Sequence, residues 1–78
     1  MEKEKFLKQF GLRLKELRGD KNLSQETLAG YCELDRTYIS GLERGRRNPS
    51  LTCIFKVANG LNIEVEELIK GLEYEKQH

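Results

Sequence analysis

A short polar segment, residues 36–40, gathers side chains that can make several hydrogen bonds at once. Arg36 carries a planar guanidinium group, which can donate two parallel hydrogen bonds to a pair of acceptors. Thr37 and Ser40 add hydroxyl groups, and Tyr38 adds a ring with a hydroxyl. Such groups on one helical turn suit the edges of DNA bases, with guanine O6 and N7 as the usual partners of arginine. Tyr38 either joins them or packs on the body of the domain, and the alternative for the other three is a solvated surface side chain.

Further side chains on either side of this segment suit phosphate rather than bases. Amide and guanidinium groups bind phosphate oxygens, and they set affinity and salt dependence without reading sequence. One of these side chains stands at the start of a predicted helix, whose positive end favours an anion, and the other four follow residues 36–40 along the chain. These residues are Gln25, Arg44, Arg46, Arg47 and Asn48.

Charge is distributed unevenly along the 78 residues. The net charge is only +1, so the overall balance does not indicate nucleic-acid binding. Residues 35–56, however, contain five Lys and Arg against two Asp and Glu, and residues 57–78 contain two against five. The chain therefore has a basic part around the polar segment and an acidic part towards its C-terminal end.

Several classes of protein are disfavoured. Cys32 and Cys53, with the single histidine His78, fit neither a zinc site nor a dense disulfide framework, so we expect two free, buried thiols and no metal or cofactor. No apolar run approaches the roughly 20 residues of a membrane helix, and residues 1–8 are too charged for a secretory signal. We therefore expect a cytoplasmic protein, and no catalytic constellation indicates an enzyme.

Apolar periodicity and capping residues predict five short helices and no strand. The helices are expected at residues 4–18, 25–32, 36 to about 43, 51–59 and 65–72. Gly19 and Gly60 would end the first and fourth. The expected N-caps of the later four are Ser24, Asp35, Ser50 and Glu64. The fourth helix is expected to turn inward Leu51, Ile54, Phe55 and Ala58. Together these elements predict one domain over residues 1–78, with a core at about 4–72 and a frayed tail at 73–78.

The second and third predicted helices are separated by only three residues, which is the spacing of a helix-turn-helix. Ala29 is the small residue that lets the first of these helices approach the second. Apolar side chains at Leu28, Ile39 and Leu42 would fix the angle between them. At that angle the first turn of the second helix, which begins with Arg36, projects from the domain and can enter the major groove of DNA.

Over residues 10–72 the chain resembles the phage-repressor and Cro-like helix-turn-helix family. The resemblance is carried by LR at 17–18, LSQETLA at 23–29, ISGLERG at 39–45 and NPSL at 48–51. Within that family, DRTYISGLER at 35–44 is most similar to the controller proteins of restriction-modification systems. One departure is Glu33, which stands where the family often has glycine in a left-handed turn, so we expect mild strain or a slightly altered turn.

The resemblance implies a compact five-helix bundle of the lambda-repressor-like DNA-binding type. It also implies a buried ion pair between Arg18 and Glu43, which would tie the first helix to the end of the third. A controller protein of this kind would regulate its own gene and the endonuclease gene, switching between activation and repression with concentration. The alternatives are a phage or chromosomal repressor and an antitoxin-like protein-interaction module.

The expected partners are double-stranded DNA with a two-fold symmetric operator and a second copy of the chain, with RNA polymerase as a further candidate. One small domain touches too few base pairs to be selective, and proteins of this kind read paired half-sites. The contact between copies must lie away from Arg36, on the fourth and fifth helices. Its candidate residues, which alternatively complete the monomer core, are Phe55, Ile63, Val65 and Leu68.

Overall fold

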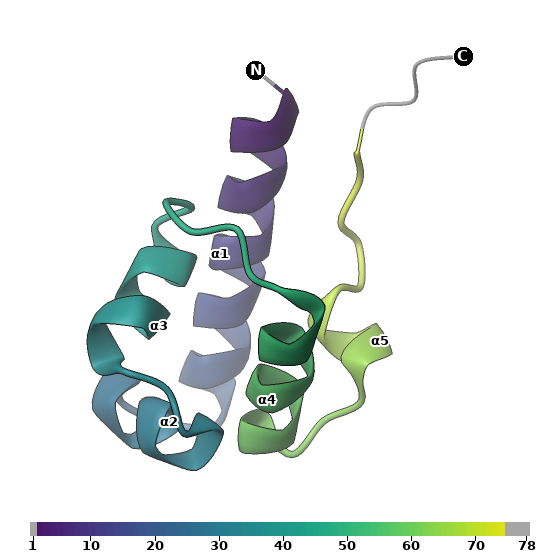
Figure 1. Ribbon diagram of the computed structural model, residues 1–78. Helices are drawn as coiled ribbons and strands as arrows, with labels where there is room; N and C mark the ends of the chain where they lie inside the picture. The colour runs from purple at the N-terminus through teal and green to yellow at the C-terminus, as the bar shows by residue number, and fades with distance from the viewer. Residues whose placement is uncertain (1, 75–78) are drawn as a thin grey trace.

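Five helices and no strand make up residues 2–74, the part of the chain that the computed structural model describes (Figure 1). They are α1 (Glu2–Asp20), α2 (Gln25–Cys32), α3 (Arg36–Glu43), α4 (Leu51–Leu61) and α5 (Val65–Leu68). The predicted class, the number of helices and the positions of α2 and α3 are confirmed. His78 and its neighbours from residue 75 onward lie outside the described residues.

Helix α1 is longer than the predicted 4–18, because Gly19 lies inside it rather than ending it. The helix ends where Asn22 adopts a left-handed conformation, with φ of 56°. Asparagine reaches this conformation more easily than most residues with a Cβ, and the Leu23 N–H then donates to the Arg18 carbonyl at 3.1 Å.

Helix α4 also continues past its predicted end, to Leu61, and stops at the left-handed Asn62 with φ of 58°. Gly60 lies inside the helix, at a position where a Cβ would collide with the Cys32 Sγ atom. This glycine therefore permits close packing of α2 on α4. The predicted inward face was also wrong in part: Leu51 is 70% exposed and Phe55 is 51% exposed.

Helix α5 is shorter than predicted, ending at Leu68 rather than at 72. The chain then turns through Gly71, with φ of 83°, and returns along α1. The Gln9 side-chain amide donates to the Glu73 carbonyl at 3.2 Å and accepts from the Glu73 N–H at 3.3 Å. Tyr74 packs on Phe6 with ring centroids 5.3 Å apart. Glu73 and Tyr74, the first two residues of the predicted tail, therefore lie against α1.

Two of the four predicted caps use their side chains. Ser24 accepts from the Thr27 N–H at 3.0 Å, and Ser50 accepts from the Cys53 N–H at 3.1 Å. Asp35 and Glu64 occupy cap positions but make no side-chain capping bond. The starts of α2 and α4 are therefore fixed by serine hydroxyls, whereas α3 begins without such a bond.

The core lies where α1 packs on α3 and α2 packs on α4. Its fully buried large side chains are Leu14, Leu28, Ile39, Leu42, Val57, Leu61 and Leu68. Both cysteines are buried and free, as predicted. Burial raises the pKa of the Cys32 thiol to about 11, so this thiol stays protonated at neutral pH. Within residues 2–74, no helix is long and apolar enough to cross a bilayer.

Candidate nucleic-acid interface

The turn between α2 and α3 keeps its predicted geometry although it lacks the glycine. Glu33 adopts the left-handed conformation itself, with φ of 59° and ψ of 43°. The Leu34 N–H donates to the Ala29 carbonyl at 2.9 Å and closes the turn. A left-handed residue with a Cβ costs about 1–2 kcal/mol, which is the strain expected here. The motif is therefore formed at a small cost in stability.

The first turn of α3 presents its polar side chains outward. Arg36 and Thr37 are exposed, and Ser40, one turn further on, is half-buried. Arg36 shares a hollow of about 480 Å³ with Ser24, Gln25 and neighbouring residues at the start of α2. The fold thus brings the predicted base-reading arginine next to the predicted phosphate ligand Gln25.

Tyr38 belongs partly to the body of the domain. It is half-buried against the core, and burial, followed by hydrogen bonding to Cys53, raises the pKa of its phenol. The Arg47 guanidinium lies 5.6 Å from the Tyr38 ring centroid. A Cβ on Gly41 would lie 2.8 Å from the Arg47 Cγ, so the arginine stem crosses α3 at this glycine. The cation–π contact and the glycine together hold Arg47 beside the recognition turn.

A buried network ties α1 to the end of α3. Arg18 donates to both carboxylate oxygens of Glu43, at 2.6 and 3.0 Å, so the ion pair that the resemblance implies is present. Arg18 also donates to the Leu23 carbonyl at 2.7 Å, and the Gln25 amide donates to Glu43 at 3.1 Å. Hydrogen bonding to Glu43 raises the pKa of Arg18 above its ordinary value. The network fixes Gln25 as well as the two helices.

One glycine beside this network escaped the sequence analysis. Gly11 is buried where α1 crosses the end of α3, and a Cβ there would lie within 2.5 Å of the Leu42 carbonyl oxygen. The close approach that Gly11 permits sets α1 against α3 near the Arg18–Glu43 pair. A glycine inside an amphipathic helix was the available signal. Such a residue lowers helix stability by about 1 kcal/mol relative to alanine, so a packing reason for it is expected.

The segment after α3 carries the remaining predicted phosphate ligands. Arg44, Arg46 and Asn48 are exposed, and they follow the negative end of α3, which favours cations. Gly45 is left-handed, with φ of 74°, and the Arg46 N–H donates to the Gly41 carbonyl at 2.9 Å. The backbone that presents these side chains is therefore fixed.

The residues predicted for a contact between copies separate into two groups. Phe55 is 51% exposed on α4, and Ile63 and Val65 are half-buried. Leu68 is fully buried, so it completes the monomer core and is not available to a partner. Leu51 and Ile69, which were not predicted, are 70% and 43% exposed.

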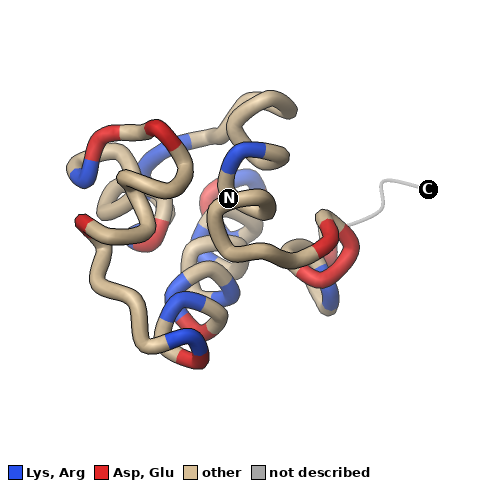
Figure 2. The backbone as a smooth tube through the Cα atoms, turned by 90° about the horizontal axis from the view of Figure 1, so that it is seen from below, with Lys and Arg blue, Asp and Glu red and all other residues tan. Residues whose placement is uncertain are grey.

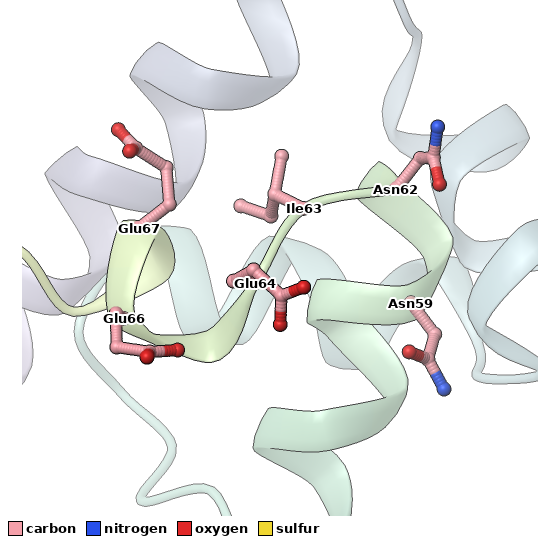
Figure 3. A pocket seen from close by; sticks show the side chains of 6 residues that line it. All are labelled: Asn59, Asn62, Ile63, Glu64, Glu66 and Glu67. Carbon is pink, nitrogen blue, oxygen red and sulfur yellow. The ribbon is translucent and has the colours of Figure 1, made fainter.

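The acidic part of the chain lies away from the recognition turn. Figure 1 shows α5 on the far side of α1 and α4 from α3, and Figure 2 shows a group of acidic residues there. A hollow of about 700 Å³ at this place is lined by two asparagines, Ile63 and three glutamates (Figure 3). Of these, Glu67 turns towards α1, where it pairs with Arg13 at 2.5 Å. The carboxylates of the three glutamates make this hollow unsuitable for phosphate.

The helix-turn-helix family matches residues 14–68, which include the turn and both flanking helices. The chain belongs to this family. It is 48% identical over 67 residues to control protein C.MunI of a Mycoplasma species, a match that covers 85% of this chain and 90% of that protein. It is 46% identical over 61 residues to control protein C.BamHI of Bacillus amyloliquefaciens, covering 77% and 75%.

A solved structure agrees with these relatives. The restriction-modification controller protein C.AhdI from Aeromonas hydrophila is 58% identical and superposes with a TM-score of 0.78, over 80% of this chain and 94% of that one. The predicted lambda-repressor-like fold is thereby confirmed. The chain is a DNA-binding transcriptional regulator of the controller type, a non-enzymatic class, as the resemblance implied.

Proposed function

We propose that this chain binds a two-fold symmetric operator as a homodimer, in the cytoplasm, and controls its own gene together with that of a restriction endonuclease. The observation that carries the proposal is the first turn of α3, where Arg36 and Thr37 are exposed and Arg36 lies beside Gln25. In this arrangement Arg36, Thr37 and Ser40 read base edges in the major groove. Selection of bound sequences from random duplex DNA tests the proposal, and recovery of a single inverted repeat supports it.

The phosphate contacts lie on both sides of that turn. Gln25 is oriented by its hydrogen bond to Glu43, at 3.1 Å, at the start of α2. Arg44, Arg46, Arg47 and Asn48 follow the end of α3. These two sets of phosphate ligands, one on each side of the turn, suit the two DNA strands that flank a major groove. They set the register of the recognition turn on the DNA. RNA polymerase is a further proposed partner, because a regulator that activates a promoter must act on it.

The proposed dimer uses the exposed apolar side chains of α4. Leu51 and Phe55 are one helical turn apart, so they lie on the same face, and both are more than half exposed. In a two-fold symmetric dimer the same contact occurs twice, so Leu51 and Phe55 of each subunit pack against the other subunit. Such a dimer carries two recognition turns, which suit half-sites about 34 Å apart.

Phe55→Asp is expected to weaken self-association by about a hundredfold or more, because two buried phenyl rings per dimer are each worth roughly 1.5–3 kcal/mol. Sedimentation equilibrium measures this, with the wild type dimeric at tens of micromolar. Leu12→Asp is the matched control, since Leu12 is 66% exposed but lies on α1. A monomeric wild type at that concentration, or equal effects of the two substitutions, would contradict the α4 interface.

A further inference from the structure

A cleft of about 1000 Å³ lies between the first half of α1 and the segment that follows α3. Figure 1 shows this segment crossing the N-terminal half of α1. The basic residues that line the cleft are Lys5 and Lys8 from α1 and Arg44 and Arg46 from the segment, and Glu4 is the one carboxylate. The cleft therefore holds four cationic side chains against a single acidic one.

Backbone packing holds the two walls of the cleft together. Gly45 is left-handed and lies directly on α1, where a Cβ would come within 2.8 Å of the Lys8 Cγ and 3.0 Å of its Cα. Because the nearest atoms include the α1 backbone, a larger residue could not be accommodated by moving a flexible side chain. The backbone that carries Arg44 and Arg46 is thus held next to the lysines of α1.

The described residues, 2–74, provide no ion-pair partner for the four cations of the cleft. Among residues 2–74, the ion pairs involve Arg13 and Arg18, and none involves Lys5, Lys8, Arg44 or Arg46. Like charges that converge in one concave surface repel each other, and they concentrate the positive potential there. A bound polyanion relieves that repulsion and releases its own counterions.

We propose that Lys5 and Lys8 of this cleft bind phosphodiester groups of the operator beyond those contacted by the recognition turn. The proposal rests on the proposed function, and it adds α1 to the DNA-binding surface. Its basis is continuity: Arg44 and Arg46 line the cleft and also belong to the segment assigned to DNA phosphates. The two lysines would then follow the same strand and contribute affinity and salt dependence without reading bases.

The double variant Lys5→Gln/Lys8→Gln tests this. Loss of two phosphate contacts in each subunit, four per dimer, should reduce the slope of log affinity against log salt by about 3.6. Between about 50 and 200 mM salt, the variant should then lose roughly 150-fold less affinity than the wild type. The preferred sequence should not change, because phosphate contacts carry no base information. Both lysines are exposed, so the melting temperature should also be unchanged.

Lys15→Gln/Lys70→Gln is the matched control, because it removes the same charge from exposed residues that do not line the cleft. Equal salt slopes for the two double variants would overturn the cleft proposal, while wild-type binding to the inverted repeat would leave the proposed function intact. A wild type with no sequence-specific DNA binding would overturn both.

A free phosphate ion is the other source of the same ligand chemistry. Titration of the wild type with inorganic phosphate alone, followed by NMR shifts of Lys8 and Gly45, distinguishes the two. Weak shifts that do not saturate at millimolar phosphate are expected for a surface that needs the DNA backbone. Saturation at micromolar phosphate would instead assign the cleft to a free anion and overturn the proposal.

Discussion

Glu43→Ala is expected to lower the free energy of unfolding by about 3–5 kcal/mol, because it leaves the Arg18 guanidinium part-buried without its carboxylate. DNA binding should fall as well, since Gln25 loses the acceptor that orients its side chain. Chemical denaturation and operator binding, measured on the same preparation, test the two effects. An unchanged free energy of unfolding with selective loss of DNA binding would show that Glu43 has no structural role.

The control for this prediction removes both charges. Arg18→Met combined with Glu43→Leu leaves no buried ion, and replacing a buried pair by apolar residues of similar size is often close to neutral. The double variant should therefore recover most of the stability that Glu43→Ala loses. A double variant as unstable as Glu43→Ala would place the cost in packing around the pair rather than in an uncompensated charge.

Arg36→Ala is expected to reduce specific operator affinity by about 2–6 kcal/mol per dimer, because each half-site loses a bidentate contact to guanine worth about 1–3 kcal/mol. Binding to unrelated DNA should fall much less, since phosphate contacts dominate it. The free energy of unfolding should change by less than about 0.5 kcal/mol, because Arg36 is exposed. Competition binding with operator and random duplexes measures the ratio of the two affinities.

Arg36→Lys separates hydrogen-bond geometry from charge. Lysine keeps the positive charge but lacks the planar fork that matches guanine O6 and N7. Specificity should therefore remain well below that of the wild type, whereas non-specific affinity should be nearly unchanged. Full recovery of specificity with lysine would mean that Arg36 acts only as a charge.

The parts of the fold that follow from local rules could be predicted from the sequence. Ser24 and Ser50 are strong caps, so the starts of α2 and α4 were placed correctly. The predicted helix ends were wrong where tertiary contacts overrode local preference. Glycine often ends a helix, but Gly60 lies inside α4, where it allows the close contact with Cys32. Asn62 ends the helix instead.

The candidate site was predictable where a motif fixes it, and less so elsewhere. The turn 33–35 and the exposure of Arg36 follow from the spacing of two amphipathic helices. The packing of Tyr38 against the core and beneath Arg47 depends on the path of the chain after α3, which the pattern does not encode. The cleft at Lys8 could not be predicted for the same reason, because its second wall comes from residues more than thirty positions away along the chain.

Selection of bound sequences from random duplex DNA, performed in parallel with wild type and Arg36→Ala, tests the central claim most directly. The account predicts that the wild type enriches one inverted repeat, with half-sites about one helical turn apart and a guanine in each that Arg36→Ala no longer requires. No enrichment by the wild type, or the same guanine preference in both proteins, would contradict it.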